Sequence, residues 1–250
     1  VAWPGRYLAR ARLLERPDYG GAPCRPDQGV RRQEALLSIP ESELSADDHL
    51  IARISSRLLA SPEPVAPAAL TPDWLPDVPP NRPPVPAAVL ISLIRRPEGL
   101  SILYTERSPD LRSHSGQIAF PGGKIDPEDA GPGAAAVREA GEEVAMRAGD
   151  ARILGYMPLY YTGTNYLITP VVAEVTPSAP FVPNPGEVRS VFEVPLDYLM
   201  ETTNYSTFRI NRAGREHSTW QINHSGLVIW GITANLTRRF HDLALSPEVG

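Results

Sequence analysis

Charged side chains that could hold a metal ion crowd one short segment of this sequence. Arg138 is followed directly by Glu139, and then by Glu142 and Glu143. On an α-helix, residues three and four positions apart lie on the same side, so the three carboxylates are expected to converge. Like charges at this spacing repel each other, and binding of a divalent cation would explain their clustering. A solvated helix face is the alternative interpretation.

The residues before this segment favour metal binding. A Phe-Pro dipeptide leads into Gly122 and Gly123, and paired glycines let the backbone approach a ligand closely, although a plain turn would also use them. Pro132 suits the first turn of a helix, because the N–H that proline lacks has no partner there. The acidic helix is therefore expected to begin near Gly131.

The segment from Gly122 to Val144 resembles the Nudix box, with the pattern G-x5-E-x7-R-E-U-x-E-E-x-G-U, where U is a bulky aliphatic residue. The resemblance implies Mg²⁺ or Mn²⁺ as the cofactor, with Arg138 bracing the glutamates through a salt bridge. The implied metal ligands are Gly123, Glu139, Glu142 and Glu143. The implied catalytic residues are Arg138, Glu139, Glu142 and Glu143.

Two departures from the pattern bear on local structure. The loop before the helix holds one extra residue, so either Glu128 or Asp129 stands for the isolated acidic position. Ala145 replaces the glycine that normally ends the helix in a left-handed conformation. The helix is therefore expected to continue to a cap at Gly149. Gly141 lies inside the helix, where glycine costs about 1 kcal/mol relative to alanine.

The upstream sequence narrows the resemblance. Residues 103–108 and 111–123 resemble the signature L-L-T-x-R-S-x-x-L-R-x-H-x-G-Q-U-x-F-P-G-G of the coenzyme A pyrophosphatase branch of Nudix hydrolases. The arginine side chains suit phosphate oxygens, or one of them ties the loop to carboxylates. His114 is either a general base or a structural residue. The implied substrate-binding residues are Arg107, Arg112, Ser113, Gly116 and Gln117.

The branch resemblance implies a reaction. Water would attack the diphosphate of coenzyme A or acyl-CoA, giving 3′,5′-ADP and phosphopantetheine or its acyl derivative. A bound metal lowers the pKa of water, so the reaction needs no histidine. The alternative substrates are other nucleoside diphosphate derivatives, namely ADP-ribose, a dinucleotide or a damaged nucleotide. A non-catalytic ligand sensor is a further alternative.

The composition fits an enzyme acting on a small nucleotide. The 250 residues carry a net charge of −5, and no concentrated basic stripe is present, which argues against nucleic-acid binding. Cys24 is the single cysteine, so an intramolecular disulfide is excluded. Without a membrane-length apolar run or a signal peptide, a cytoplasmic protein with no membrane contact is expected. Family analogy allows a homodimer.

The chain is expected to fall into four parts. Residues 1–40 form a leader, interpreted as disordered. Residues 41–61 form an N-terminal helix with Ser45 as its N-cap. Residues 62–86 hold too many prolines for a helix or a central strand and form a connector. Residues 87–245 form the Nudix domain, for which the resemblance implies an α/β/α sandwich with a mixed sheet.

Hydrophobic patterning predicts the elements of this domain. Residues 87–94 and 100–105 are expected to pair as antiparallel strands across a turn at 97–99. Further strands are expected at 153–159, 167–175 and 191–195, with a helical turn at 196–200. Residues 208–210 and 219–222 are expected to form a hairpin, and 227–240 a closing helix.

Overall fold

The computed structural model describes residues 44–64, 83–110, 116–212 and 215–245. The expected leader at 1–40 and most of the proline-rich connector at 62–86 lie outside the described residues. Arg112, Ser113 and His114 lie outside them as well.

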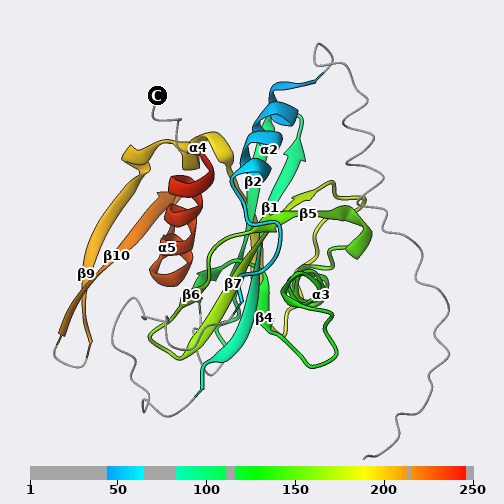
Figure 1. The fold of residues 1–250 in the computed structure, drawn as a ribbon. Coiled ribbons are helices and arrows are strands. Elements are labelled where there is room, and N and C mark those ends of the chain that lie inside the picture. The colour runs from blue at the N-terminus through cyan, green and yellow to red at the C-terminus, as the bar shows by residue number, and fades with distance from the viewer. Residues whose placement is uncertain (1–43, 65–82, 111–115, 213–214, 246–250) are drawn as a thin grey trace, which may run out of the picture. The chain divides into compact units, whose positions relative to one another are not determined.

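An eight-stranded mixed sheet forms the centre of the domain (Figure 1). Its strands are β1 Val85–Arg96, β2 Gly99–Arg107, β3 Ile118–Ala119, β4 Gly122–Lys124, β5 Ala151–Tyr156, β6 Tyr160–Tyr161, β7 Tyr166–Val175 and β8 Val188–Pro195. β1 pairs in parallel with β7, and the other pairings in this sheet are antiparallel. The expected hairpin of β1 and β2 is confirmed, with Leu93 opposite Ile102.

β1 changes its antiparallel partner along its length. Its first part pairs with β4, where Ala88 lies opposite Gly123, and its second part pairs with β2. β3 and β8 both pair with β2 at Thr105, so they must lie on opposite edges of that strand. The short β3 and β4 are thereby held by two long strands, which fixes the glycine turn beside the sheet.

Helices cover both faces of the sheet (Figure 1). α3, Pro132–Val144, packs on one face, where Ala136 and Ala140 share a core cluster with Leu90 of β1. The opposite face is covered by α2 Ala46–Ser56, α4 Leu196–Met200 and α5 Gly231–Phe240. Ile91 packs with these helices, because successive residues of a strand point to opposite faces. The predicted α/β/α sandwich with a mixed sheet is confirmed.

α2 is held by its cap and by an ion pair. Ser45 and Asp48 form a capping box, in which the Asp48 carboxylate accepts from the Ser45 N–H at 2.9 Å. Arg95 of β1 donates to the same carboxylate at 2.6 Å. The predicted N-cap is confirmed, while the helix ends at Ser56 and is shorter than the predicted span of 41–61.

α3 begins at Pro132, as expected, but it ends before the predicted cap at Gly149. Ala145 follows the helix in a left-handed conformation with φ 55°, and its N–H donates to the Gly141 carbonyl at 3.1 Å. Met146 then turns into the core cluster of that face. The predicted extension is wrong, because burial of Met146 stabilises an early left-handed ending of the helix.

A three-stranded antiparallel sheet follows α4. Its strands are β9 Tyr205–Arg212, β10 Arg215–His224 and β11 Leu227–Trp230. The hairpin predicted at 208–210 and 219–222 is confirmed and is longer than expected. The helix predicted at 227–240 is wrong over β11, because Ile229 pairs with Ile222 as a strand and Gly231, at φ 66°, turns the chain into α5.

Shorter elements complete the described chain. They are the 3-10 turns Ala148–Asp150 and Thr202–Asn204 and the π-helical turn His241–Leu245. The strands predicted at 167–175 and 191–195 and the helical turn at 196–200 are confirmed. The strand predicted at 153–159 instead ends at Tyr156.

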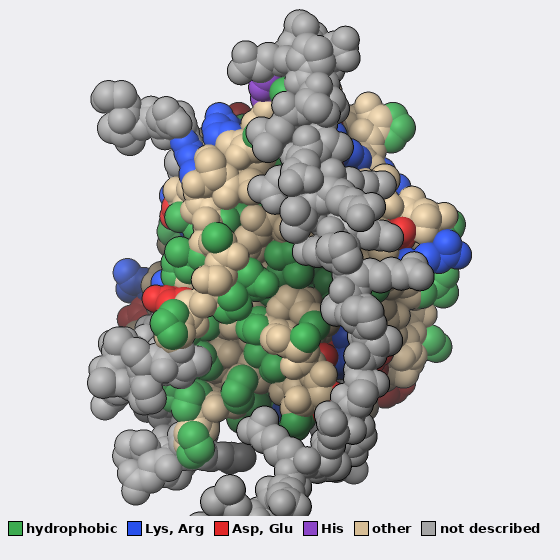
Figure 2. Space-filling model, turned by 45° about the vertical axis from the view of Figure 1, so that its right-hand side comes forward, with side chains coloured by type: hydrophobic (Ala, Val, Ile, Leu, Met, Phe, Trp, Pro, Cys, Tyr) green, Lys and Arg blue, Asp and Glu red, His purple; other side chains and the backbone are tan. Residues whose placement is uncertain are grey.

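Hydrophobic side chains gather over a broad area of the face drawn in Figure 2, with charged side chains toward its edges. Large exposed hydrophobic residues of the described chain include Leu59 and Ile153, each 39% exposed. Apolar atoms contribute more than half of the accessible surface of folded proteins, so such an area does not by itself indicate a binding site. None of the described helices is both long and apolar enough to cross a membrane.

Candidate active site

A pocket of about 570 Å³ is lined by residues of β4, α3 and α5. Three carboxylate side chains line it, those of Glu139, Glu143 and Glu187. The lining also includes two cationic side chains, Arg107 and Lys124. The pocket therefore brings together three of the charged residues predicted from the sequence, Arg107, Glu139 and Glu143, and adds Lys124 and Glu187.

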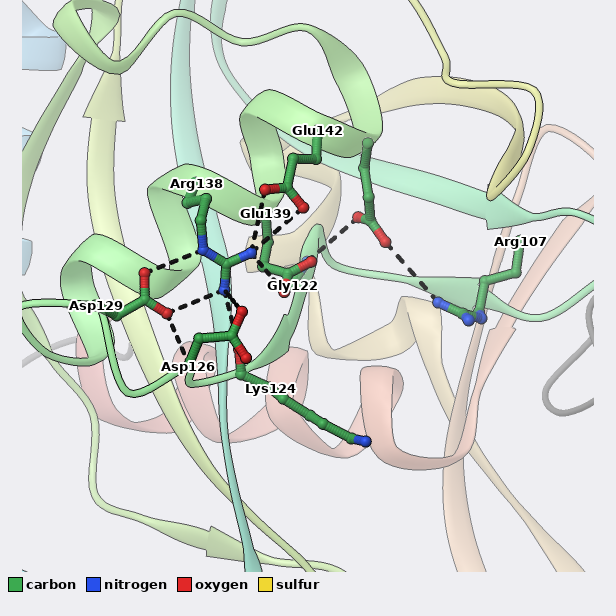
Figure 3. Close-up of polar contacts among 9 residues, drawn as sticks. Arg107, Gly122, Lys124, Asp126, Asp129, Arg138, Glu139 and Glu142 are labelled. Atoms are coloured by element: carbon green, nitrogen blue, oxygen red, sulfur yellow. Dashed lines mark hydrogen bonds and ion pairs between the residues drawn. The ribbon is translucent and has the colours of Figure 1, made fainter.

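Arg138 lies at the centre of a network of acceptors beside this pocket (Figure 3). Its Nε and Nη2 atoms each donate to one oxygen of Asp129 at 3.0 Å. Its Nη1 atom donates to Glu139 at 3.1 Å and to Glu142 at 3.3 Å, and Nη2 also donates to the Lys124 carbonyl at 3.2 Å. The hydrogen bonds that Arg138 donates to Asp129 contribute most to raising the pKa of Arg138. The charged guanidinium thus fixes both glutamates, as only its five donors permit.

Asp129, rather than Glu128, is the isolated acidic residue that reaches the network. Its Oδ2 atom accepts from the Asp126 N–H at 2.9 Å, and its contact with Arg138 lowers its pKa. Glu128 is exposed on the loop. The extra loop residue therefore leaves Asp129 aligned with the arginine.

Glu143 is almost fully buried, with 3% of its surface exposed. Its Oε2 atom accepts from the Gly122 N–H at 3.2 Å, and its Oε1 atom lies 3.8 Å from Nη1 of Arg107. Burial raises the pKa of Glu143 to about 7, although the Gly122 N–H and Arg107 act in the opposite direction. The protein alone therefore compensates the charge of this carboxylate only in part.

Glu139 lies against the glycine turn. A Cβ atom on Gly123 would overlap the Glu139 carboxylate, so this position requires glycine. Gly122 is restricted by its φ of 156° and by the nearby carbonyl of Ala88. Burial raises the pKa of Glu139, and this effect exceeds the opposing effect of Arg138. The glycines thus allow the partly buried carboxylate of Glu139 to lie against the sheet.

Glu142 differs from the other two glutamates of α3. Its side chain is 55% exposed, bonds Arg138 and does not line the pocket. Among the described residues, no group of three or more His, Cys, Asp or Glu side chains is arranged to hold a metal ion. The expected convergence of three carboxylates is not seen in this arrangement, because Glu142 bonds Arg138 whereas Glu143 bonds the backbone of Gly122.

Glu187 is a pocket residue to which the sequence assigned no role. It lies just before β8, where its N–H donates to the Asn184 carbonyl at 2.9 Å and its carbonyl accepts from the Ser108 N–H at 2.8 Å. Its charge contributes to raising the pKa values of Glu139 and Glu143. The Asn-Pro-Gly sequence before it was the available signal, since turns often carry functional side chains.

The predicted substrate-binding residues differ in whether they line the pocket. Arg107 and Gln117 line the pocket, and the buried Nε atom of Arg107 has no hydrogen-bond partner among the described residues. Gly116 does not line the pocket, although its N–H donates to the Arg107 carbonyl at 3.2 Å. Arg112 and Ser113 lie outside the described residues, so their roles stay predictions.

α5 provides an apolar wall of the pocket. Ile232 and Leu236 line it together with Ile168 of β7. The Thr233 hydroxyl donates to the Ile118 carbonyl of β3 at 2.8 Å, which ties the helix to the segment leading into β4. The wall suits the organic part of a ligand whose charged part lies among the carboxylates.

The donor set of the pocket fits a hard divalent cation. Mg²⁺ and Mn²⁺ prefer oxygen ligands, and Mg²⁺ keeps several of its waters, so a few protein carboxylates suffice. The raised pKa values of Glu139 and Glu143 identify carboxylates whose charged form a cation would stabilise.

Comparison with known proteins identifies the domain: the NUDIX domain family model matches residues 84–211, more than half of the chain. The chain belongs to the Nudix family. A similar Nudix protein is the uncharacterized Nudix hydrolase NudL of Escherichia coli strain K12, 41% identical over 163 residues that cover 65% of this chain and 83% of NudL. NudL of Shigella boydii serotype 18 has the same identity and coverage. β10, β11 and α5 of this Nudix hydrolase lie beyond the matched residues.

A solved structure with a similar chain is the Nudix hydrolase RenU from M. smegmatis. It is 22% identical, with a TM-score of 0.45, and the match covers 68% of this chain and 91% of RenU.

Proposed function

We propose that this Nudix hydrolase cleaves the diphosphate of coenzyme A or acyl-CoA, with Mg²⁺ or Mn²⁺, to 3′,5′-ADP and phosphopantetheine or its acyl derivative. One observation carries the chemistry: Glu139, Glu143 and Glu187 line a single pocket beside the glycine turn. The resemblance of residues 103–108 and 111–123 to the coenzyme A branch supports the substrate class.

The cation would be held by Glu139 and Glu143, with Glu142 and Gly123 added by the family pattern and Glu187 by its place in the pocket. When bound, it lowers the pKa of water and neutralises charge that develops on the diphosphate. Arg138 orients Glu139 and Glu142 through its Nη1 atom. The Gly122 N–H orients the buried Glu143.

Residues of the pocket also bind the substrate and accept the proton that water releases. The oxygen of water forms a bond to one phosphorus of the diphosphate, and the bond from that phosphorus to the bridging oxygen breaks. The proton of water passes to a pocket carboxylate. Glu187 is free to accept it, since its side chain has no ion pair among the described residues. Arg107, which lines the pocket, supplies hydrogen bonds to a phosphate oxygen.

Product analysis on a substrate panel tests the proposal. The full-length protein is incubated with coenzyme A, dephospho-coenzyme A, ADP-ribose, a dinucleoside polyphosphate and an oxidised nucleotide, each with Mg²⁺ or Mn²⁺. We expect coenzyme A to have the highest kcat/KM and to yield 3′,5′-ADP, identified by mass spectrometry. Faster cleavage of ADP-ribose than of coenzyme A would show that coenzyme A is not the preferred substrate. If no compound of the panel is cleaved, the protein is a ligand sensor.

Glu143→Gln tests whether the observed activity belongs to this pocket. We expect kcat/KM to fall at least about 100-fold, more than the loss of an outer contact of a metal site usually causes. Glu98→Gln is the matched control, because Glu98 is exposed in the turn between β1 and β2 and does not line the pocket. Unchanged activity of Glu143→Gln would contradict the assignment.

A further inference from the structure

Lys124 is the only lysine among the 24 lysine and arginine residues of the chain. It is the last residue of β4, where it lies opposite Ala87 of β1. Its carbonyl accepts a hydrogen bond from Nη2 of Arg138 at 3.2 Å. The backbone of this lysine is therefore fixed from two sides, by the sheet and by the arginine.

The side chain of Lys124, in contrast, has no partner within the described part of the chain. Among the described residues, its ammonium group makes no hydrogen bond and no ion pair. Figure 3 shows the side chain extending away from the carboxylates that Arg138 binds. It nevertheless lines the same pocket as Glu139 and Glu143. An ammonium group has three donors and no acceptor, so all three are available to a ligand.

A solvated surface lysine is the competing explanation. All the other basic residues among the 24 lysines and arginines are arginines, and the single lysine lies in the pocket. The other cation of the lining, Arg107, is partly compensated by Glu143 at 3.8 Å. An anionic ligand that approaches several carboxylates needs an uncompensated cation, and Lys124 provides it.

We propose that Lys124 is a phosphate-binding residue of this pocket, whose ammonium group donates to a non-bridging oxygen of the substrate's diphosphate. The presence of a diphosphate rests on the proposed function. A lysine ammonium is a compact charge on a flexible stem, so it reaches a phosphate without displacing Arg138 from the glutamates. Its role is thus separate from that of the metal-binding carboxylates.

The single lysine permits a direct binding test. Full-length protein with a lysine-free tag is treated with an acetylating N-hydroxysuccinimide ester, and mass spectrometry measures acetylation of Lys124 against the α-amino group. We expect inorganic pyrophosphate with Mg²⁺ to slow acetylation of Lys124 severalfold and to leave the α-amino group unaffected. Equal rates with and without pyrophosphate would overturn the proposal. The readout needs no turnover, so it remains valid if coenzyme A is not the substrate.

Kinetics of Lys124→Met and Lys124→Arg test the role in the reaction. Loss of a charged hydrogen bond is expected to lower kcat/KM of the methionine variant about 10- to 100-fold. The arginine variant keeps the charge and should lose less. Arg209→Met is the matched control, since Arg209 pairs with Glu216 and does not line the pocket. Wild-type kcat/KM in a folded Lys124→Met variant would overturn the proposal.

Dephospho-coenzyme A separates the phosphates that Lys124 could bind, because it keeps the diphosphate and lacks the 3′-phosphate. An equal loss on both substrates supports contact with the diphosphate. A loss confined to coenzyme A assigns Lys124 to the 3′-phosphate and overturns the proposed contact. If the wild type prefers another nucleotide, the proposed function is wrong. The kcat/KM values of the Lys124 variants on that nucleotide then still test whether Lys124 binds its diphosphate.

Discussion

Single residues of the site differ in how well their charges are compensated. Asp129 receives two bonds from one guanidinium, and its pKa is lowered. Glu143 is buried with one N–H donor and a distant arginine, and its pKa is raised. Entry of a cation would therefore stabilise the charged form of Glu143 more than that of Asp129. Asp129 thus braces Arg138, and we propose that Glu143 is the acid that binds the cation.

The raised pKa of Glu143 gives the metal-free protein a distinctive pH dependence. Its pKa rises from 4.5 to about 7 on folding, so the folded state binds more protons and loses stability as the pH rises through this window. The full loss is on the order of 3 kcal/mol. In EDTA, we expect the free energy of unfolding to fall with pH more steeply in the wild type than in Glu143→Gln. Parallel urea-unfolding curves for the two proteins would contradict this.

For single residues, the sequence predicted which side chains belong to the site better than it predicted where each side chain points. The spacing of Arg138, Glu139 and Glu142 was sufficient to place them together, because a helix fixes its near neighbours locally. It could not show that Glu142 lies outside the pocket lining, since packing of the helix on the sheet decides that. Glu187 was not assigned, because only tertiary structure brings its turn to the helix.

Among the elements, α3 ends with local backbone strain. Ala145 adopts a left-handed conformation at φ 55°, which costs an alanine about 1 kcal/mol. The hydrogen bond to the Gly141 carbonyl and the burial of Met146 offset this cost. The strain at Ala145 arises from its Cβ atom, which substitution by glycine removes.

Ala145→Gly is expected to stabilise the protein by up to about 1 kcal/mol, because glycine adopts positive φ without steric cost. Ala134→Gly is the matched control, since the same substitution at an exposed position of α3 should destabilise by up to about 1 kcal/mol. Urea unfolding measures both changes. Destabilisation by both substitutions would show that Ala145 is not strained.

Element boundaries were predictable where a local signal set them. Ser45 and Pro132 mark helix starts through capping and through a missing donor, and both were predicted correctly. The segment 227–240 was predicted as one helix because its apolar residues suit helical spacing. Only its pairing with β10, a long-range contact, separates β11 from α5.

On the scale of the whole domain, the C-terminal module, β9 to α5, is continuous with the Nudix core. Ile222 and Phe240 of the module belong to the same core cluster as Ile91 of β1. Buried hydrogen bonds join the two parts, including that of the Tyr104 and Thr237 hydroxyls at 3.0 Å. We expect the module and the core to unfold together.

Thr233→Val tests this connection. It removes the hydroxyl that donates to the buried Ile118 carbonyl at 2.8 Å, with little change in shape. We expect a loss of about 1 to 3 kcal/mol in the free energy of unfolding, in one cooperative urea transition. Thr207→Val, at an exposed position of β9, is the control and should change little. Two separate transitions would show that the module is an independent unit.

The parallel pairing of β1 with β7 also determines when the site can form. Val85 lies opposite Tyr166, so the loop that this pairing closes contains β2 to β6 and α3. Closing so long a loop costs chain entropy before the contact is gained, and pairings between distant residues form slowly. Pulsed hydrogen exchange should therefore show protection in the hairpin of β1 and β2 before β7. On this folding order, the carboxylates of α3 would come together in the pocket only late, and a metal ion would not guide the first contacts of the chain.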